Sequence, residues 1–234
     1  MTQEIFTTGF PRVGSNWLGR ILSDLLNSPM QTMPDKKIDT EFAERIEEPY
    51  PYIIRRTHWY LDQWADMDHR GYGGEPAKII WITRDPRDMV VSMMHYRRQE
   101  NIIPVIKSIN NGGKRKERGL PGGFIAYVDG WIRNPPDFRL SYEGLHVHPE
   151  WTLQRLHTKI IGKPVSPGEI ERVVERQEFD KWQPKYPGSM YEGTHGQWRR
   201  HFDREAAELM DELYGDQIID LGYERNSEWV TTVN

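Results

Sequence analysis

The chain has 234 residues, a formal net charge of −4 and no cysteine, and these facts exclude several kinds of protein. Without cysteine there is no disulfide framework, no thiolate metal site and no cysteine nucleophile. The slightly acidic balance argues against a general nucleic-acid-binding surface. No apolar run reaches the roughly 18 residues of a membrane span, and the first residues lack the basic and apolar regions of a secretory signal. We therefore expect a cytoplasmic protein with one domain over residues 1–234, and with neither nucleic acid nor membrane as a partner.

Four short apolar runs predict the strands of a sheet. They lie at residues 5–8, 52–54, 78–83 and, more weakly, 138–141. Polar loops and helical patterns follow them, and strands that alternate with helices are typical of a parallel sheet with helices on both faces. We expect an α/β three-layer sandwich with a central parallel sheet of four to five strands and a phosphate-binding loop after the first strand. Ligands of such sheets bind at the carboxyl ends of the strands.

Helical periodicity is clearest in three segments. Apolar residues recur at helical spacing over residues 17–26, and a second pattern over 86–98 has proline where a helix start tolerates it. Asp203 is a suitable N-cap for a third helix, which we expect to end at Gly215. The glycine-rich stretch 101–123 favours a mobile loop or a lid.

The loop after the first strand has the spacing of a phosphate-binding loop, because four residues separate Gly9 from Gly14. Such glycines let the backbone curl until successive N–H groups point inward, and the N-terminus of the next helix adds its own N–H groups and dipole. Arg12 adds a fixed positive charge. Ser15 and Asn16 stand where a nucleoside triphosphatase has its lysine and its magnesium-binding hydroxyl, which weakens an ATP–magnesium interpretation. The alternative is a strand–turn–helix whose glycines serve geometry alone.

A second candidate anion site follows the third strand. Arg84 lies at the end of that strand, and Ser92 lies on the helix predicted after it. A guanidinium and a hydroxyl on the same face can clamp an anionic group. The alternative is a structural ion pair between Arg84 and Asp88, with Ser92 on the helix surface.

Together the two segments resemble the PAPS-dependent sulfotransferase family, in which PAPS is 3′-phosphoadenosine 5′-phosphosulfate. The first reads Gly-Phe-Pro-Arg-x-Gly-Ser-x-Trp-Leu, and the second reads Arg-Asp-Pro-Arg-Asp-x-x-x-Ser. Further similar segments follow in the family order at residues 56–58, 141–145, 173–182 and 193–199. The resemblance implies the family's fold and PAPS as the sulfuryl donor.

The resemblance also implies how the donor is held. Arg84 and Ser92 would bind the 3′-phosphate, and Tyr142 would contact the adenine. Phe179 and Trp182 would wall the purine, although all three aromatic residues also suit a core. Gly193 opens the C-terminal block of the same site. The residues implied around the 5′-phosphosulfate are Arg12, Val13, Gly14, Ser15, Asn16 and Trp17.

The chain also departs from the family pattern. The family loop usually carries lysine where this chain has Arg12, which keeps the charge but is a poorer proton donor. Tyr191 and Glu192 replace an Arg-Lys pair that contacts the 3′-phosphate in the family, so one contact is missing. Glu178 replaces a small hydroxyl residue near the purine. The candidates to compensate for the missing pair are Arg199, Arg200 and the basic run Lys114, Arg115 and Lys116.

The resemblance implies a mechanism with two residues in catalytic roles. His58 would take the proton from the acceptor hydroxyl, and Arg12 with the loop N–H groups would stabilise charge on the bridging oxygen. A sulfuryl group carries less charge than a phosphoryl group, so fixed cations and backbone donors suffice and we expect no metal requirement. Without the resemblance, His58 reads as an ordinary strand-end histidine.

The sequence thus predicts an enzyme that transfers a sulfuryl group from PAPS to a hydroxyl of a small molecule or carbohydrate. Two alternatives stay open: an ATP-dependent phosphoryl-transfer enzyme of related fold, and a non-catalytic nucleotide-binding protein. The acceptor pocket would come from residues 30–49, 59–64 and 101–123, in which no known motif identifies the acceptor. The oligomeric state is open as well.

Overall fold

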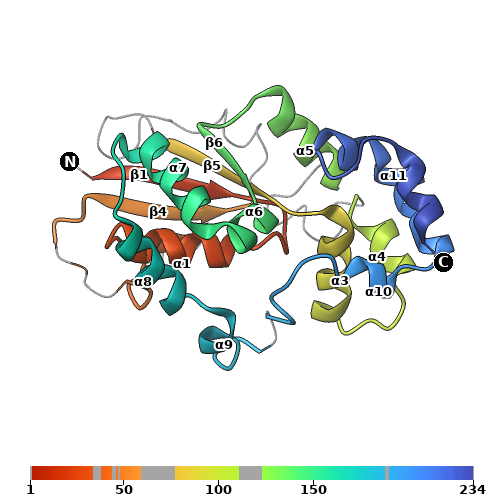
Figure 1. Cartoon of the computed structure of the whole chain (residues 1–234), viewed down its shortest axis with the longest axis horizontal. Coiled ribbons are helices and arrows are strands. Elements are labelled where there is room, and N and C mark those ends of the chain that lie inside the picture. The colour runs from red at the N-terminus through yellow and green to blue at the C-terminus, as the bar shows by residue number, and fades with distance from the viewer. Residues whose placement is uncertain are drawn as a thin grey trace.

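The fold is built on parallel pairing of strands. A computed structural model describes residues 2–33, 38–43, 46, 48–58, 77–110, 123–187 and 190–233. Within these residues, six strands form a sheet in the order β3-β2-β4-β1-β5-β6 (Figure 1). Five of them are parallel, and β3 pairs antiparallel with β2 at one edge. The expected parallel sheet is confirmed, and the strands at residues 30–32 and 38–39 are additions that no expected run covered. The strands are β1 (Gln3–Thr8), β2 (Met30–Thr32), β3 (Ile38–Asp39), β4 (Tyr52–Thr57), β5 (Lys78–Thr83) and β6 (Phe138–Ser141).

The centre of the sheet is apolar because both of its faces are covered. Strand β1 lies between β4 and β5, with Ile5 opposite Ile54 and Thr7 opposite Ile80. Ile5, Ile54 and Ile80 are fully buried. A strand covered on both faces reads as a continuous apolar run rather than an alternating one, which is why these strands could be recognised in the sequence.

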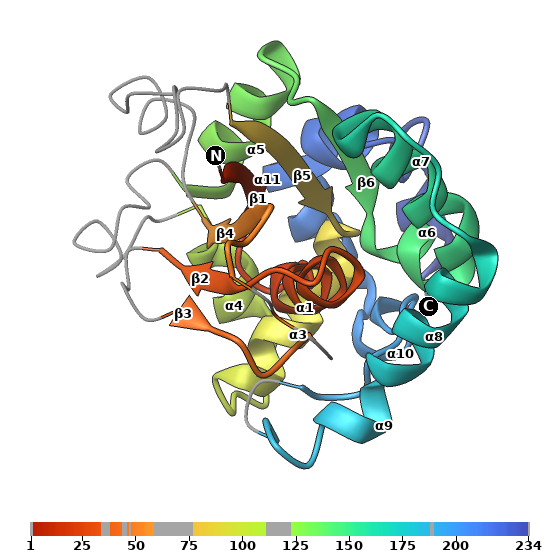
Figure 2. The same cartoon turned by 90° about the vertical axis from the view of Figure 1, so that its left-hand side faces the viewer.

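The two faces of the sheet carry different helices, which makes the three layers (Figure 2). Helix α1 (Ser15–Leu25) packs on β4. On the opposite face lies α5 (Gly123–Arg133), whose Tyr127 hydroxyl is hydrogen-bonded to Thr8 Oγ1 at 2.8 Å. The same helix stacks Trp131 on Trp81 of β5. Successive strand residues point to opposite faces, so Thr7 and Thr8 face different layers.

The remaining helices complete the layers and the C-terminal part of the chain. None of the helices in the described residues is both long enough and apolar enough to cross a membrane. They are α3 (Pro86–Tyr96), α4 (Ile103–Ser108), α6 (Tyr142–Val147), α7 (Pro149–Ile161), α8 (Pro167–Arg176), α9 (Phe179–Trp182), α10 (Trp198–His201), α11 (Arg204–Asp220) and the 3-10 helix η2 (Ser227–Thr232).

Helix α11 begins where the sequence predicted and ends later. Asp203 is its N-cap and accepts a hydrogen bond from the Ala206 N–H at 2.8 Å. The expected end at Gly215 is wrong, because the helix continues to Asp220. A glycine inside a helix costs only about 1 kcal/mol, and the buried Tyr214 and Ile218 on either side offset that cost by packing in the core.

Part of the stretch 101–123 is helical, although its composition suggested a mobile loop or a lid. Residues 103–108 form α4, whose Val105 and Ile106 are fully buried. The Tyr214 hydroxyl donates to the Ile106 carbonyl at 2.9 Å and ties α4 to α11. The expectation of a mobile loop is therefore wrong for this part. The basic run 114–116 lies outside the described residues.

A buried arginine anchors the C-terminal segments to the start of α3. Arg87 forms ion pairs with Asp85 at 2.8 Å and with Glu224 at 2.7 Å. Its guanidinium also lies between the rings of Trp198 and Trp229, at 3.9 and 4.5 Å from their centroids. These contacts hold α10 and η2 beside the loop that follows β5.

Candidate functional site

The loop between β1 and α1 forms an open cradle of backbone N–H groups. Gly14 is the N-cap of α1, with φ of +91°, and it offers no capping side chain to the first N–H groups of the helix. A Cβ on Gly14 would approach the Tyr142 ring to 2.7 Å, so only glycine fits both this backbone and this neighbour. Val13 and Ser15 are buried in the loop, and Asn16 is exposed. Uncapped N–H groups at a helix N-terminus attract an oxyanion.

Arg12 extends from this loop to α3. Its backbone is in the left-handed region, with φ of +78°. Its Nε donates a hydrogen bond to Ser92 Oγ at 3.2 Å, and its guanidinium lies 4.6 Å from the centroid of the Tyr96 ring. The two segments singled out in the sequence are therefore in direct contact.

Arg84 makes the second link between them. Its Nη1 donates to the Arg12 carbonyl at 3.2 Å, and its Nη2 donates to the Thr194 carbonyl at 2.9 Å. Its guanidinium lies over the Tyr142 ring at 4.4 Å. The Nε of Arg84 is buried and has no hydrogen-bond partner within the described part of the chain. A buried donor without a partner costs about 1–3 kcal/mol, and an anionic ligand would supply the missing acceptor.

Asp88 has a different partner from the one that the ion-pair alternative proposed. Its carboxylate accepts hydrogen bonds from the Gly196 N–H at 2.5 Å and from the Trp198 N–H at 2.9 Å. Burial raises the pKa of Asp88, and these two bonds act in the opposite direction. Asp88 thereby holds the segment 194–198 in place. In that segment the Thr194 carbonyl accepts the hydrogen bond from Arg84.

Aromatic side chains from three segments meet on the other side of Arg84. The Trp17 ring packs edge-on against Tyr142 at 5.4 Å, and its indole N–H donates to the Gln177 carbonyl at 3.1 Å. Gly193 has φ of +65°, and a Cβ there would lie 2.1 Å from the Phe179 ring. Phe179 therefore packs directly over the Gly193 backbone. Burial raises the pKa of the Tyr142 phenol, which keeps it neutral.

Trp182 lies deeper than Phe179. It is 7% exposed and packs against Phe42 at 5.3 Å, with the Arg20 guanidinium 4.8 Å from its ring. Its indole N–H donates to the Arg176 carbonyl at 2.9 Å. These contacts are those of a core residue, and its predicted contact with a purine stays a prediction.

His58 sits at the carboxyl end of β4, beside the start of the loop. Its Nδ1 lies 2.5 Å from the Gly9 carbonyl, and its Nε2 lies 3.2 Å from Arg56 Nη1. A carbonyl only accepts and a guanidinium only donates, so Nδ1 carries the proton and Nε2 carries the lone pair. Burial lowers the pKa of Arg56 to about 10, which still leaves it charged at neutral pH. The imidazole is thus held as a neutral base with Nε2 as its basic atom.

Comparisons with known proteins identify the family. The family model described as "Sulfotransferase domain" matches residues 2–222. The chain belongs to the sulfotransferase family. Sulfotransferase 2A1 of Homo sapiens is 22% identical over 94% of this chain and 85% of its own length, and sulfotransferase 2A2 of Mus musculus is 24% identical over 92% and 84%. The resemblance to this family that the sequence suggested is confirmed.

Solved sulfotransferase structures share the fold. Mouse sulfotransferase SULT7A1 complexed with PAP has a TM-score of 0.69 at 19% identity, covering 98% of this chain and 88% of its own. Retinol dehydratase in complex with androsterone and the inactive cofactor PAP has a TM-score of 0.63 at 17% identity, covering 92% and 80%. At these identities the comparisons support the architecture, and the residues must be argued from this sulfotransferase's own contacts.

Nearly all of the predicted site residues come together in this sulfotransferase. One series of contacts runs from the loop through Arg84 and Tyr142 to the segments around residues 177–179 and 193–194, and His58 joins it through Gly9. Trp182 is the exception, because its contacts lie in the core. Sequence reasoning missed Tyr96, Arg56 and Thr194 as neighbours of the site. The sequence carried a signal only for Arg56, which lies two residues before His58. Thr194 contacts the site through its backbone carbonyl, which does not depend on the residue type.

The structure describes two of the three candidates to replace the missing basic pair. Arg200 forms an ion pair with Glu192 at 2.6 Å, and Arg199 lies over the Trp198 ring at 4.4 Å. Tyr191 stacks on His95 with 3.6 Å between ring centroids. The third candidate, the run 114–116, lies outside the described residues, as do residues 59–64 of the expected acceptor pocket.

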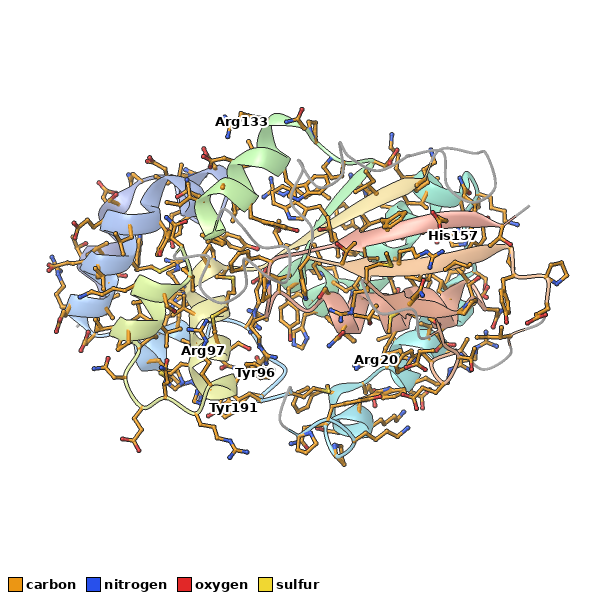
Figure 3. The ribbon with its side chains drawn as sticks, turned by 180° about the vertical axis from the view of Figure 1, so that it is seen from behind. Arg20, Tyr96, Arg97, Arg133, His157 and Tyr191 are labelled. Carbon is orange, nitrogen blue, oxygen red and sulfur yellow. The ribbon has the colours of Figure 1, made fainter. Side chains whose placement is uncertain are left out.

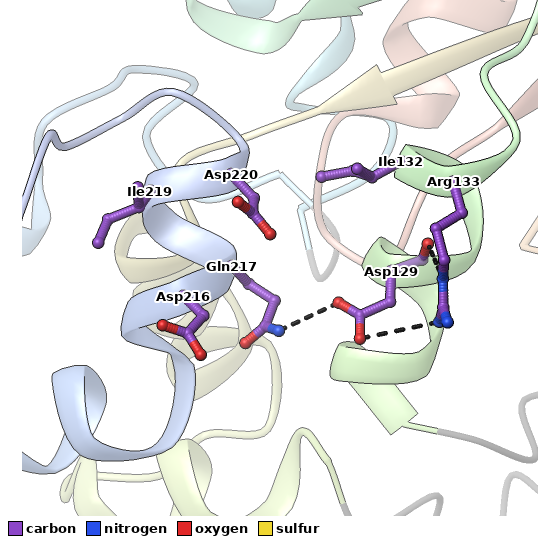
Figure 4. A pocket seen from close by; sticks show the side chains of 7 residues that line it. All are labelled: Asp129, Ile132, Arg133, Asp216, Gln217, Ile219 and Asp220. Atoms are coloured by element: carbon purple, nitrogen blue, oxygen red, sulfur yellow. Dashed lines mark hydrogen bonds and ion pairs between the residues drawn. The ribbon is translucent and has the colours of Figure 1, made fainter.

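Two open hollows in the described part of the chain are lined by residues other than those predicted for the site. One, of about 420 Å³, lies between α5 and α11, where Gln217 and Arg133 both contact Asp129 (Figure 4). The other, of about 450 Å³, lies beside β6 and Tyr223. In the part of the chain that the structure describes, no three His, Asp or Glu side chains are grouped to hold a metal ion.

Proposed function

We propose that this sulfotransferase transfers the sulfuryl group of PAPS to a hydroxyl of a small-molecule acceptor, with His58 as the general base. The single observation that carries the proposal is the contact series that joins Arg12, Arg84 and Tyr142. It supports one continuous site for the phosphates and the base of an adenine nucleotide. The structures of SULT7A1 and retinol dehydratase are complexes with PAP, which supports the same choice of nucleotide.

The residues present fit such a nucleotide. Arg84 has a buried Nε that lacks an acceptor among the described residues, and α3 offers the Ser92 hydroxyl. The N–H groups of residues 14–17 would form the cradle for the 5′-phosphosulfate, in which Gly14 leaves room. Trp17, Tyr142 and Phe179 supply flat surfaces for the purine. Bound PAPS would supply the sulfuryl group and a phosphate leaving group.

His58 is the residue proposed to move the proton. Its Nδ1–H is held by the Gly9 carbonyl, so the Nε2 lone pair is directed away from the loop backbone. The acceptor hydroxyl would take the place of Arg56 at Nε2, since both groups donate to that atom. His58 then receives the hydroxyl proton while the loop N–H groups stabilise charge on the leaving oxygen.

The acceptor class follows from the relatives rather than from a pocket. One guinea pig relative is named 3-alpha-hydroxysteroid sulfotransferase, and retinol dehydratase has been solved in complexes with androsterone and with retinol. These names favour a small apolar alcohol over the carbohydrate that the sequence also allowed. We propose hydroxylated apolar molecules as the first acceptors to test.

Two measurements on the full chain test the proposal. Titration calorimetry should detect binding of adenosine 3′,5′-bisphosphate and weaker or no binding of ATP–magnesium. Incubation with PAPS carrying labelled sulfate should transfer label to sterols, retinoids or phenols, with sugars as the comparison panel. Preference for ATP–magnesium would point to phosphoryl transfer. Nucleotide binding without transfer to any acceptor would point to a non-catalytic nucleotide-binding protein.

A further inference from the structure

We propose that Arg12 binds the 3′-phosphate of the nucleotide, and so replaces the basic pair that positions 191 and 192 lack. The inference rests on the proposed function and revises one part of the sequence-based expectation. There, Arg12 was placed on the 5′ side with the rest of its loop. The side chain of Arg12 is directed instead toward Ser92, the residue expected to bind the 3′-phosphate.

The first argument is the hydrogen bond between Arg12 and Ser92. Arg12 Nε donates to Ser92 Oγ at 3.2 Å, while the guanidinium lies against the Tyr96 ring one turn further along α3. A phosphate oxygen that accepts the Ser92 hydroxyl proton is therefore within about 6 Å of a full positive charge, close enough for a substantial attraction. An anion bound by Ser92 would therefore lie next to the Arg12 guanidinium.

The backbone of Arg12 supports the same orientation. Its φ of +78° is uncommon for a residue with a side chain, and such conformations persist only when their surroundings hold them in place. Arg84 contributes to this by donating to the Arg12 carbonyl at 3.2 Å. The two residues are therefore in contact, and the Nε of Arg84, which has no partner among the described residues, is a second donor that the same phosphate group would reach. Two guanidinium groups match the charge of a phosphate monoester dianion.

The third argument is that the other nearby arginines have partners elsewhere. Glu192 neutralises Arg200 at 2.6 Å, and Arg199 lies on the Trp198 ring. Tyr191 stacks on His95 of α3, and in Figure 3 it lies beside Tyr96 at the same end of the helix. Among the arginines of the described residues, Arg12 is the one hydrogen-bonded to Ser92.

The test compares nucleotides that differ by one phosphate. Calorimetry on the full chain measures the affinities of adenosine 3′,5′-bisphosphate and adenosine 5′-monophosphate for the wild type, Arg12→Gln and Ser92→Ala. Arg12→Gln should weaken bisphosphate binding by about 10- to 100-fold, the range of a lost charge-assisted hydrogen bond. It should change monophosphate binding less than about twofold. Ser92→Ala should show the same selectivity with a smaller loss, and it avoids any change at the strained backbone of Arg12.

Arg97→Gln is the matched control, because it also removes one guanidinium group. Arg97 lies at the C-terminal end of α3, the helix that carries Ser92. Arg97 Nη1 donates to Ser108 Oγ instead of Ser92, and the control should change neither affinity. If Arg12→Gln weakens both nucleotides equally, Arg12 serves the 5′ side and the inference fails. If it weakens neither, Arg12 contacts no phosphate. If the wild type itself does not prefer the bisphosphate, the proposed function fails rather than this assignment.

Discussion

The Nη1 atom of Arg84 donates a hydrogen bond to the backbone carbonyl of Arg12 at 3.2 Å, across 72 residues of sequence. This bond joins the loop after β1 to the end of β5. Because the two strands are adjacent and parallel, their carboxyl ends meet at one edge of the sheet. The phosphate-binding loop and Arg84 are therefore held together at that edge.

Replacing Arg84 by lysine should weaken nucleotide binding while the positive charge is kept. Lysine cannot donate to the Arg12 and Thr194 carbonyls in the same forked geometry, and it has no equivalent of the buried Nε. We expect the affinity for adenosine 3′,5′-bisphosphate to fall by about 1.5–3 kcal/mol, the value of a hydrogen bond to a charged group. Calorimetry measures this. Arg133→Lys, an exposed side chain at the end of α5, is the control (Figure 3), and equal effects of both substitutions would contradict the prediction.

Gly14→Ala and Gly162→Ala separate backbone strain from steric clash. Both glycines have positive φ, +91° and +82°, but a Cβ on Gly162 meets nothing within 4 Å, whereas one on Gly14 lies 2.7 Å from the Tyr142 ring. Each substitution should cost about 1–2 kcal/mol from the left-handed backbone. Gly14→Ala should cost a further 1–3 kcal/mol from the clash and should weaken nucleotide binding. Urea unfolding measures the difference, and equal losses of stability would contradict the clash.

His58→Ala should lower turnover while nucleotide affinity is unchanged. Removing a general base costs about 10²- to 10⁴-fold in rate, and the described contacts of His58 are with Gly9 and Arg56 rather than with the cradle N–H groups. The measurement is the kcat of labelled sulfate transfer, with calorimetry of adenosine 3′,5′-bisphosphate in parallel. His157→Ala on α7 is a comparison for histidine loss, since that side chain contacts the Lys163 carbonyl. Unchanged turnover in His58→Ala would remove the base assignment.

Phe179→Ala and Trp182→Ala should have different effects although only two residues separate them. Phe179 is half-buried over Gly193, so its loss should lower nucleotide affinity by about 1–3 kcal/mol, the value of one base–aromatic stack. Trp182 fills the space between Phe42 and Arg20, so its loss should cost about 3–5 kcal/mol of unfolding free energy. Calorimetry and urea unfolding of both variants decide this. A stable Trp182→Ala protein with weak nucleotide binding would instead make Trp182 a purine contact.

His95 should make the protein less stable as the pH falls. Burial and the nearby His201 lower the pKa of His95 below its usual 6.5, while Glu192 acts in the opposite direction. The unfolded chain therefore binds the proton more readily, and stability is lost as the pH falls through about 6.5. His95→Gln should show a shallower decline in unfolding free energy between pH 7.5 and 5.5. Exposed His148→Gln is the control for losing one histidine, and parallel curves for His95→Gln and the wild type would contradict the prediction.

Several parts of this molecule could be predicted because neighbouring residues determine them. The buried strands β1, β4 and β5 each contain a short apolar run, and the cap of α11 needs only Asp203 and the N–H groups that follow it. The order of the strands and the short edge strand β3 could not be predicted, since two-residue pairing leaves no periodic signal. The end of α11 was wrong because buried neighbours outweighed the effect of Gly215.

The sequence by itself determined the local backbone of this sulfotransferase: where the glycines let the loop curl, where helices begin, and which residues follow each strand. Only the tertiary structure decided where the long side chains point. Arg12 reaches Ser92 and Trp182 lies in the core because their partners are distant in the chain, at α3 and near Phe42. Backbone conformation depends on adjacent residues, whereas the partner of an arginine or a tryptophan depends on how the strands and helices pack, and no local pattern records that.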